Sequence, residues 1–340
     1  MKLNEEYIRD LSLVESAIPI EQLSGKRICI TGATGLIGSA VADILLYLKT
    51  RKGLNLEIYL SGRNEEKIAK RFGFWAGSFC FLPYFEINNW NIALDYFVHC
   101  AENAHPKVFS ENPAETLVSS VEGINSVLRY VHKFGGRLCY LSSSEVYGKT
   151  QTDRPICENE MGFVDLSDAR SCYPSAKRAA ETLCACYLKE YGTYSVIVRP
   201  GHIYGAGFTR EDSRAFAQFA RNVLSGQNIV MKSEGLQIRS YCYALDCASA
   251  ILSVAVKGRS GEAYNIANPS SNVSIRRLAE TFAAVAGRKV VFDLPTQSEL
   301  NGYNKMTYSA LNSDKLLRLG WKGKFNIGKG VESTLKFCEL

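Results

Sequence analysis

Short apolar runs alternate with longer amphipathic stretches along residues 1–200. The apolar runs are strand-length and rich in β-branched and aromatic residues, and they lie at 26–31, 56–63, 79–87, 95–102, 137–144 and 194–201. Between them, helical periodicity is clearest at 39–50, 113–133 and 173–191. Strands that are apolar on both faces and alternate with helices are typical of a parallel sheet covered by helices. The pattern therefore predicts an α/β fold with a doubly wound parallel sheet, preceded by a short amphipathic helix within 1–24.

The rhythm of the pattern changes after Gly201. A loop rich in glycine and charge precedes further predicted elements, namely a helix at 215–226, a strand at 228–233, a strand at 263–269, a helix at 274–287 and a last helix at the C-terminus. We expect 201–237 and 266–340 to form a smaller C-terminal α/β substrate lobe. The strand–helix pair near 238–265 is expected to return to the large sheet, which otherwise comprises residues 1–200.

Three glycines at a spacing of three follow the first strand and open the next helix, in the segment GATGLIG. A turn without side chains lets a pyrophosphate approach the backbone amides and the positive end of a helix. With a strand before it and a helix after it, the segment predicts a dinucleotide-binding turn in a Rossmann-type sheet. The alternative is a glycine-rich turn without a ligand. The residues expected to contact the cofactor there are Gly32, Thr34, Gly35, Leu36, Ile37 and Gly38.

The end of the second strand bears on the identity of the cofactor. In sheets that bind NAD, an acid at this place bonds the ribose hydroxyl. Here the strand runs into Arg63 without an acid, and an arginine can pair with a 2′-phosphate, so we favour NADP over NAD. A solvated loop charge is the alternative role for Arg63. Glu86 and Ile87 end the third predicted strand, where the acid could hold the adenine amino group or simply face solvent.

A phenol and an ammonium share one face of the predicted helix at 173–191. Tyr173 and Lys177 are four residues apart and therefore lie one helical turn from each other. A free phenol loses its proton near pH ~10. A cation about 4 Å away, at an effective dielectric of roughly 20, favours the phenolate by up to ~4 kcal/mol. We therefore expect Lys177 to lower the pKa of Tyr173 and to make this phenol a usable proton shuttle.

Composition narrows the classes of function. The net charge of +6 is scattered along the 340 residues without a basic run that contains aromatics, so nucleic-acid binding is not expected. The N-terminal segment is polar and acidic, which together with the short apolar runs predicts no membrane segment and a cytoplasmic location. The eleven cysteines contain no C-x-x-C pair and have no histidines at metal-ligand spacing, so we expect reduced thiols and no metal site.

Several segments together resemble the extended branch of the short-chain dehydrogenase/reductase family, which includes nucleotide-sugar epimerases, dehydratases and decarboxylases. The resemblance covers nearly the whole chain after residue 25 and is carried by GATGLIG, VHCAENAHPKVFSENP, LSSSEVYG, YPSAK, RPGHIYGAG, QIRSYCYALD and LGW. It implies an NAD(P)-dependent enzyme that abstracts a hydride from C4 of a nucleotide-diphosphate sugar and proceeds through a 4-keto intermediate. It also implies a homodimer joined by the helices at 113–133 and 173–191.

The resemblance also assigns roles to individual residues. Ser143 would bond the reacting oxygen of the sugar, and Tyr173 would be the acid/base. Lys177 would hold the cofactor ribose while lowering the pKa of Tyr173. Cys100 and Ala101, which follow the fourth strand, would contact the cofactor. The phenol would need to be acidic because it takes the proton of a sugar hydroxyl as the hydride leaves for the nicotinamide.

Glu145 bears on the step that follows oxidation. It comes two residues after Ser143, and on a strand the two side chains would share one face of the sheet. The pair Ser144–Glu145 resembles GDP-mannose 4,6-dehydratases and UDP-glucuronate decarboxylases, and ARSCY and KRAAETLC resemble the latter most. The resemblance implies a second-step base for dehydration or decarboxylation. The alternatives are a 4-epimerase or 4-ketoreductase, a strand-end charge without chemistry, and a non-catalytic cofactor-binding protein.

Some positions depart from the family pattern. His202 stands where many relatives have an asparagine near the sugar nucleotide, and Glu102 replaces a small residue beside the cofactor. An arginine expected near the C-terminal signature to bind the substrate diphosphate is missing, and Tyr308 is close to that place. Cations elsewhere would then bind the diphosphate. The predicted substrate contacts are Ser144, His202, Arg214 and Arg239.

Overall fold

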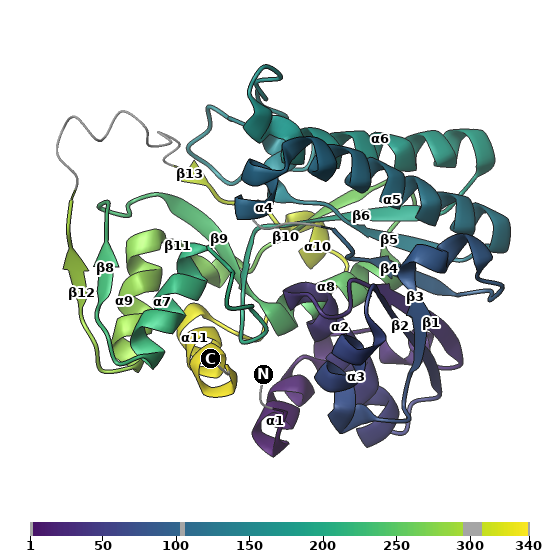
Figure 1. The fold of residues 1–340 in the computed structure, drawn as a ribbon, viewed down its shortest axis with the longest axis horizontal. Coiled ribbons are helices and arrows are strands. Elements are labelled where there is room, and N and C mark those ends of the chain that lie inside the picture. Colours follow the sequence, from purple (N-terminus) through teal and green to yellow (C-terminus); the bar gives the residue numbers. More distant parts are fainter. Residues whose placement is uncertain (1–2, 103–105, 295–307, 339–340) are drawn as a thin grey trace.

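The computed structural model describes residues 3–102, 106–294 and 308–338. Its centre is a seven-stranded sheet with the order β10-β6-β5-β4-β1-β2-β3, in which all neighbours are parallel (Figure 1). The strands are β1 (Lys26–Thr31), β2 (Leu56–Gly62), β3 (Cys80–Pro83), β4 (Tyr96–His99), β5 (Arg137–Leu141), β6 (Ser195–Pro200) and β10 (Ala263–Ile266). This order is that of a dinucleotide-binding sheet with one more strand beside β6, so the predicted Rossmann-type α/β architecture is confirmed.

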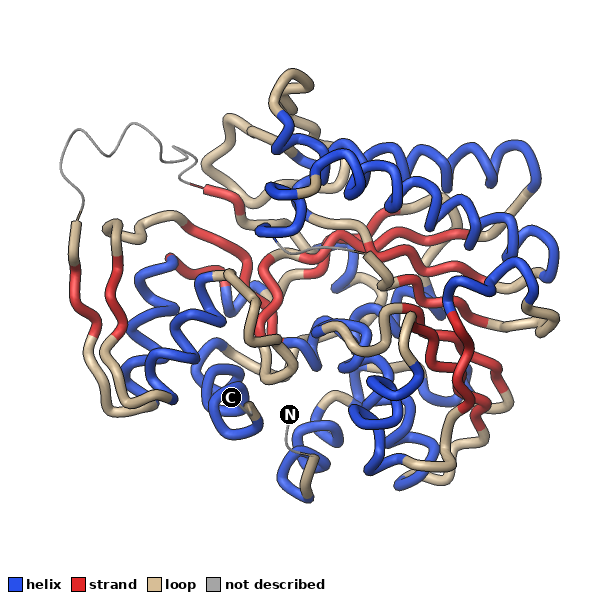
Figure 2. Tube along the Cα trace, in the orientation of Figure 1, coloured by secondary structure: helices blue, strands red, loops and turns tan. Residues whose placement is uncertain are grey.

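Helices cover both faces of this sheet (Figures 1 and 2). One face carries α4 (Pro106–Glu111), α5 (Pro113–Phe134) and α6 (Cys172–Tyr191). The other face carries α1 (Glu5–Leu13), α2 (Leu36–Arg51), α3 (Glu65–Phe72) and α8 (Ala244–Lys257). The predicted N-terminal helix is α1, which two 3-10 turns connect to β1.

Neighbouring residues of each strand face opposite sides of the sheet, and both sides are buried. In β1, Ile28 and Ile30 pack in the core beneath α2 and α8, whereas Cys29 packs in the core beneath α5 and α6. Leu138 and Tyr140 of β5 also face the α5–α6 side. This double burial explains why the strands are apolar at consecutive positions.

The smaller lobe contains two further sheets. β7 (His202–Tyr204), β9 (Ile238–Tyr243), β11 (Asn272–Ser274) and β13 (Tyr308–Ser309) form one, and β8 (Ile229–Met231) pairs with β12 (Val290–Phe292) in the other. The helices are α7 (Ala215–Leu224), α9 (Ile275–Val285) and α11 (Ile327–Phe337), whereas the short α10 (Asp314–Leu317) packs on β10 of the large sheet. The helices predicted at 215–226, at 274–287 and at the C-terminus are confirmed.

The prediction that the strand near 238 joins the large sheet is wrong. That strand is β9, which pairs with β7 in the smaller lobe, and the additional strand of the large sheet is β10. The chain leaves the large sheet at Gly201, where a Cβ would lie only 2.6 Å from the carbonyl oxygen of Ser240 in β9. Directly after this close approach, His202 begins the pairing of β7 with β9. The following helix, α8, does pack against β5 and β6 as expected.

The third strand is shorter than predicted. It ends at Pro83, and Tyr84–Asn89 form a 3-10 turn that buries Ile87 in the core beneath α5 and leaves Glu86 exposed. Glu86 and Ile87 therefore do not end a strand. Of the apolar side chains in this turn, Ile87 is buried, whereas Phe85 is exposed.

The fifth strand also ends early. β5 stops at Leu141, and Ser143 caps the 3-10 turn Ser144–Tyr147, with its hydroxyl accepting from the Glu145 backbone N–H at 3.2 Å. The expectation that Ser143 and Glu145 share a strand face is thus wrong. A local hydroxyl cap competes with the sheet for this segment.

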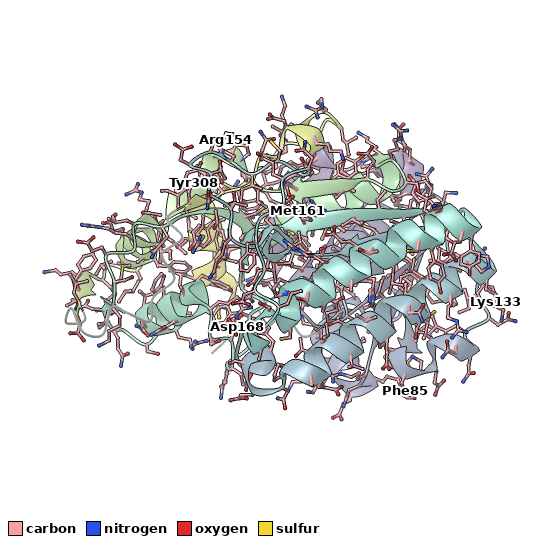
Figure 3. All side chains as sticks on the ribbon, turned by 90° about the horizontal axis from the view of Figure 1, so that it is seen from above. Phe85, Lys133, Arg154, Met161, Asp168 and Tyr308 are labelled. Atoms are coloured by element: carbon pink, nitrogen blue, oxygen red, sulfur yellow. The ribbon has the colours of Figure 1, made fainter. Side chains whose placement is uncertain are left out.

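Figure 3 views the α5–α6 layer from above. Lys133 lies at one end of α5, and Asp168 lies toward the other end of the layer, on the segment that leads into α6. The amino end of α6 therefore points toward the smaller lobe. Among the residues that the structure describes, no helix is long and apolar enough to span a bilayer.

Candidate active site

A cavity of about 380 Å³ lies between the carboxyl edge of the large sheet and the smaller lobe. Its walls come from the segment after β4, the turn after β5, the amino end of α6, and β7, α7 and β9. It brings together these predicted site residues: Ile37, Cys100, Ser143, Ser144, Glu145, Tyr173, Lys177, His202, Arg214 and Arg239. Ligands of doubly wound sheets bind at this edge, where neighbouring crossovers diverge.

The glycine turn closes on the end of β4 beside this cavity. Gly32 has φ +64°, and a Cβ there would lie 2.6 Å from the carbonyl oxygen of Cys100. A Cβ on Gly38 would lie 2.3 Å from the carbonyl oxygen of Gly32. Gly35 caps the 16-residue helix α2 without a side-chain bond, and both Thr34 and Gly35 are exposed. This bare turn before a helix end fits the pyrophosphate of a dinucleotide.

Nine predicted cofactor residues do not line the described cavity: five lie on the glycine turn, namely Gly32, Thr34, Gly35, Leu36 and Gly38, and four lie elsewhere. Arg63 is exposed one residue after β2 ends, and Ala101 is half-buried after β4. Glu86 and Ile87 lie on the 3-10 turn after β3. Their roles toward the cofactor stay predictions. Residues 103–105 of the segment VHCAENAHPKVFSENP lie outside the described residues.

Tyr173 and Lys177 stand together on the cavity wall. Lys177 Nζ lies 5.8 Å from the centroid of the Tyr173 ring and 4.9 Å from that of Tyr140. Phe109 of α4 stacks on Tyr173, with ring centroids 5.0 Å apart. The predicted pair is therefore assembled by the helix spacing, and Phe109 fixes the plane of the phenol.

Lys177 is held by groups that the sequence reasoning did not combine. Its Nζ donates to the Leu141 carbonyl oxygen at 2.5 Å and forms an ion pair with Glu102. Tyr140 donates to Glu102 Oε1 at 2.8 Å. Burial lowers the pKa of Lys177, but the Glu102 carboxylate and Tyr173 outweigh it and raise that pKa above its usual value. The signal for the Glu102–Lys177 pair in the sequence is that Glu102, an acid, follows closely after the apolar strand β4.

The expected depression of the Tyr173 pKa is wrong for the protein without cofactor. Burial is the largest influence and raises the pKa of Tyr173 above its usual value near 10. Lys177 and a hydrogen bond with Ser143 lower that pKa, whereas Glu102 and Glu145 raise it. The spacing on the helix brings the cation of Lys177 to the phenol, but burial and the two carboxylates have the larger combined effect on the pKa of Tyr173.

Glu145 reaches the cavity from the turn after β5. Both of its carboxylate oxygens accept from Arg170 Nη2, at 3.0 and 3.1 Å. The Arg170 guanidinium lies 4.3 Å from the centroid of the Phe109 ring, which itself stacks on Tyr173. Arg170 is therefore a residue of the site that the sequence reasoning missed. Its position three residues before Tyr173 was the available signal.

The smaller lobe supplies two arginines to the opposite wall. Arg214 pairs with the buried Asp212 at 2.5 Å, and Arg239 on β9 contacts the Ser309 hydroxyl. His202 is exposed at the start of β7, and desolvation, then the charges of Arg239 and Arg214, lower the pKa of its imidazole below the usual value.

Tyr308 lies on β13 and pairs with Ile238 of β9, next to the paired residues Ser309 and Arg239. It is half-buried and is not among the described residues that line the cavity.

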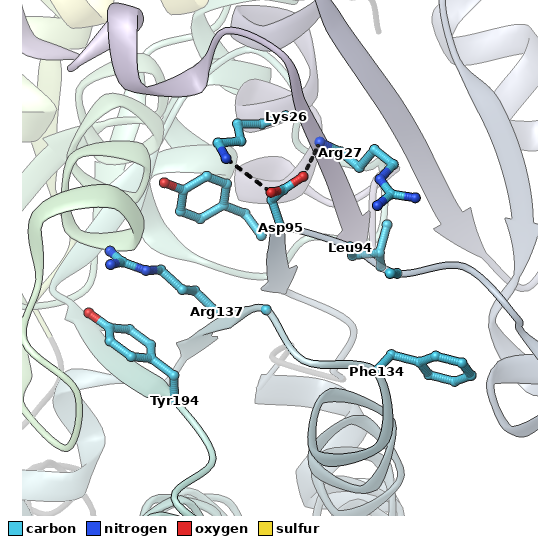
Figure 4. A pocket seen from close by; sticks show the side chains of 10 residues that line it. Lys26, Arg27, Leu94, Asp95, Phe134, Arg137 and Tyr194 are labelled. Carbon is cyan, nitrogen blue, oxygen red and sulfur yellow. Dashed lines mark hydrogen bonds and ion pairs between the residues drawn. The ribbon is translucent and has the colours of Figure 1, made fainter.

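A second cavity, of about 570 Å³, lies at the opposite edge of the sheet (Figure 4). Asp95 accepts there from Lys26 Nζ at 3.1 Å and from the Arg27 backbone N–H at 2.8 Å. Arg137 lies over the Tyr194 ring, 4.6 Å from its centroid. The contacts of Asp95 connect the start of β4 to the start of β1. The smaller cavity is the candidate active site because it joins the glycine turn to the titratable groups.

The chain matches the model of the NAD dependent epimerase/dehydratase family over residues 28–267. It is 30% identical to UDP-glucuronic acid decarboxylase 6 of Arabidopsis thaliana over 264 residues, which are 76% of this chain and 74% of that protein. It is 27% identical to UDP-glucuronic acid decarboxylase 1 of Danio rerio over 339 residues, 98% of this chain and 78% of that protein.

Solved structures share the fold. The UDP-glucose 4-epimerase of Thermotoga maritima, determined with UDP-glucose, gives a TM-score of 0.77 at 21% identity, covering 92% of this chain and 98% of that one. The dTDP-glucose 4,6-dehydratase of Bacillus anthracis, determined with NAD, gives 0.73 at 20% identity, covering 92% and 96%.

The glycine turn yields a first prediction. Gly38→Ala should weaken cofactor binding by at least about tenfold, because the new Cβ would meet the Gly32 carbonyl oxygen and push the turn apart. Gly73→Ala is the matched control, since a Cβ there meets no atom within 4 Å. Calorimetric titration with NAD and NADP measures both variants. Unchanged affinity in Gly38→Ala would contradict the assignment.

Proposed function

Because the chain belongs to the NAD-dependent epimerase/dehydratase family, we propose that it oxidises C4 of a nucleotide-diphosphate sugar and passes the 4-keto sugar to a second step. The observation that carries the proposal is the convergence of Ser143, Glu145, Tyr173 and Lys177 on one side of a single cavity. The cations of the smaller lobe line the other side. Neither set alone would indicate a charged carbohydrate substrate.

The first step needs a proton acceptor beside the sugar hydroxyl. Tyr173, as phenolate, takes the proton of the 4-hydroxyl, and Ser143 hydrogen-bonds the same oxygen. Lys177 holds the cofactor ribose and stabilises the phenolate. An oxidised nicotinamide, when bound beside these residues, would supply the acceptor for the hydride of C4. The 4-hydroxyl thereby becomes a carbonyl, with one proton on Tyr173 and one hydride transferred.

The smaller lobe suits a diphosphate. Arg214 and Arg239 line the cavity, and guanidinium groups bind phosphate oxygens through charge-assisted hydrogen bonds. His202 is neutral and can therefore donate or accept a hydrogen bond without adding charge. Ser144 also lines the cavity. The arrangement supports a nucleotide-diphosphate sugar whose phosphates face the smaller lobe and whose sugar faces α6.

Glu145 is the base of the second step. A 4-keto group acidifies the C5 proton, and a carboxylate beside the sugar could remove it and expel the C6 hydroxyl. A 4-keto sugar acid instead loses CO₂ from C5 without loss of the C5 proton, and the enolate that remains takes up a proton at C5. The names of the two curated relatives, both UDP-glucuronic acid decarboxylases, support the decarboxylation branch. UDP-glucuronic acid is therefore the first sugar to test.

A 4-epimerase or 4-ketoreductase is the second candidate. It is favoured by the ion pair between Arg170 and Glu145, because both carboxylate oxygens of Glu145 already accept from Arg170. In such an enzyme Glu145 would only position Arg170, and the ketone would be reduced without passing through elimination or decarboxylation.

The proposal extends to a homodimer through α5 and α6. Leu117 and Val118 expose 37% and 51% of their surface on α5, as an apolar contact helix would. Of the small residues on α6, Ala176 and Ala180 pack inside the chain, whereas Ala185 is exposed. The exposed face of α5 thus supports the pairing more than the alanines do.

Replacing Tyr173 tests the first step. Tyr173→Phe should lower turnover by about 10²- to 10⁴-fold while cofactor affinity stays unchanged, because only the proton acceptor is lost. Tyr191→Phe, 52% exposed at the end of the same helix, is the matched control and should keep full activity. Turnover is followed by mass spectrometry of nucleotide-sugar products. Full activity in Tyr173→Phe would remove this mechanism.

Replacing Glu145 separates the two candidate functions. Glu145→Gln should block elimination or decarboxylation by about 10²-fold and leave reduced cofactor bound, visible by its absorbance. Glu160→Gln, which removes a charge paired with the exposed Arg154, is the control. Both are assayed by mass spectrometry with UDP-, GDP-, CDP- and dTDP-sugars, including UDP-glucuronic acid. Unchanged products from Glu145→Gln would indicate the epimerase or ketoreductase.

We propose NADP as the preferred cofactor of this NAD-dependent family member, since Arg63 follows β2 and is exposed. Arg63→Ala should weaken NADP binding by about tenfold and leave NAD binding nearly unchanged. Arg277→Ala, an exposed arginine on α9, is the control. Fluorescence titration measures the affinity of each variant for NAD and for NADP. Equal losses for NAD and NADP would indicate that Arg63 does not read the 2′-phosphate.

A further inference from the structure

A buried carboxylate lies against the lysine that the proposed reaction uses. The side chains of Glu102 and Lys177 are only 7% and 3% exposed and form an ion pair. Tyr140 donates to Glu102 from β5, and Lys177 also donates to the Leu141 carbonyl oxygen. Two of the three N–H donors of Lys177 are therefore taken by the protein itself. The proposed function assigns no role to this carboxylate.

Glu102 stands beside the place where the cofactor fits. It follows Cys100, whose carbonyl oxygen abuts Gly32 in the glycine turn. Glu102, Cys100 and Lys177 all line the cavity that also holds Tyr173. A cationic ring bound in this cavity therefore enters the field of the Glu102 carboxylate.

The groups around Glu102 and Tyr173 set the charge of this corner. Burial and Glu102 raise the pKa values of Tyr84 and Tyr140, so these phenols are neutral. The positive charge of Lys177 is matched by the negative charge of Glu102. Glu145, which also raises the pKa of Tyr173, is matched by Arg170, so that pair adds no net charge. Ionising Tyr173 without a further cation would leave a net negative charge in a buried cluster, which is unfavourable.

An oxidised nicotinamide ring carries one positive charge, and a reduced ring carries none. With the oxidised ring, a Tyr173 phenolate makes the corner neutral. With the reduced ring, or with no cofactor, protonated Tyr173 makes it neutral. If Glu102 carried no charge, the phenolate would already balance Lys177 in the empty site.

We propose that Glu102 is a positioning residue that fixes Lys177 and cancels its charge, so that Tyr173 releases its proton only when an oxidised nicotinamide ring enters the cavity. The proposal rests on the proposed role of Tyr173. It makes the base of the reaction available together with the hydride acceptor. After hydride transfer the ring is neutral, and the proton taken from the sugar stays on Tyr173 until the hydride returns.

Proton release on cofactor binding tests this without a sugar substrate. Calorimetry in buffers of different ionisation enthalpy, over a series of pH values, counts the protons released. The wild-type protein should release a proton on binding the oxidised cofactor and none on binding the reduced one. Tyr173→Phe should remove this release while still binding cofactor. Equal release with both cofactors, no release, or an unchanged release in Tyr173→Phe would overturn the proposal.

Variants of Glu102 test its part in this coupling. Glu102→Gln should shift the midpoint pH of proton release downward by about one to three units, because one neighbouring negative charge is lost. Glu102→Asp keeps the charge and should keep the wild-type midpoint, and Glu160→Gln should do the same. Glu102→Ala serves as a second neutral variant if Glu102→Gln does not fold. An unchanged midpoint in the neutral variant would overturn the role of Glu102.

This result is independent of the turnover test. Loss of products in all sugars with intact, Glu102-dependent proton release would remove the proposed substrate and leave the coupling in place. Normal turnover with proton release that does not depend on Glu102 would remove the coupling and leave the proposed substrate in place.

Discussion

The geometry of the site depends most on the buried ammonium of Lys177. A buried ammonium must be paired or give up its proton, since leaving it charged and unmatched is costly. The Leu141 carbonyl oxygen binds it from the end of β5, and Glu102 pairs with it from the end of β4. Because Lys177 lies one turn after Tyr173 on α6, these two contacts also fix the place of the phenol. The ammonium of Lys177 thus connects α6 to the ends of β4 and β5.

The division into two lobes separates the chemistry from the binding of charge. At the carboxyl edge of the large sheet, the glycine turn leads into α2, and Ser143 and Glu145 lie at the 3-10 turn after β5. The smaller lobe places Arg214 and Arg239 across the cavity. Residues on α6 and the turn after β5 can therefore act on the sugar while the phosphates stay with the arginines. This arrangement suits substrates that share a diphosphate and differ in the sugar.

Features set by local pattern could be predicted from the sequence. The parallel sheet, α5 and α6 and the glycine turn follow from periodicity and spacing, and most of the predicted cavity residues follow from the resemblance to the extended short-chain dehydrogenase/reductase family. The strand at 238–243 was assigned to the wrong sheet, because an apolar run looks alike in either one. The sign of the Tyr173 pKa shift and the partners Glu102 and Arg170 depend on burial and on contacts between distant segments. The residues in each of these contacts are far apart in the sequence, so a local sequence pattern cannot predict them.

The central claim is that a hydride leaves C4 of a nucleotide-linked sugar while Tyr173 takes the proton of the hydroxyl. Its most direct test is a single turnover with cofactor-loaded protein and a nucleotide sugar deuterated at C4, quenched before product release, with the cofactor analysed by mass spectrometry. We expect deuterium on the nicotinamide ring. Formation of product with no deuterium on the cofactor at any time would contradict the account.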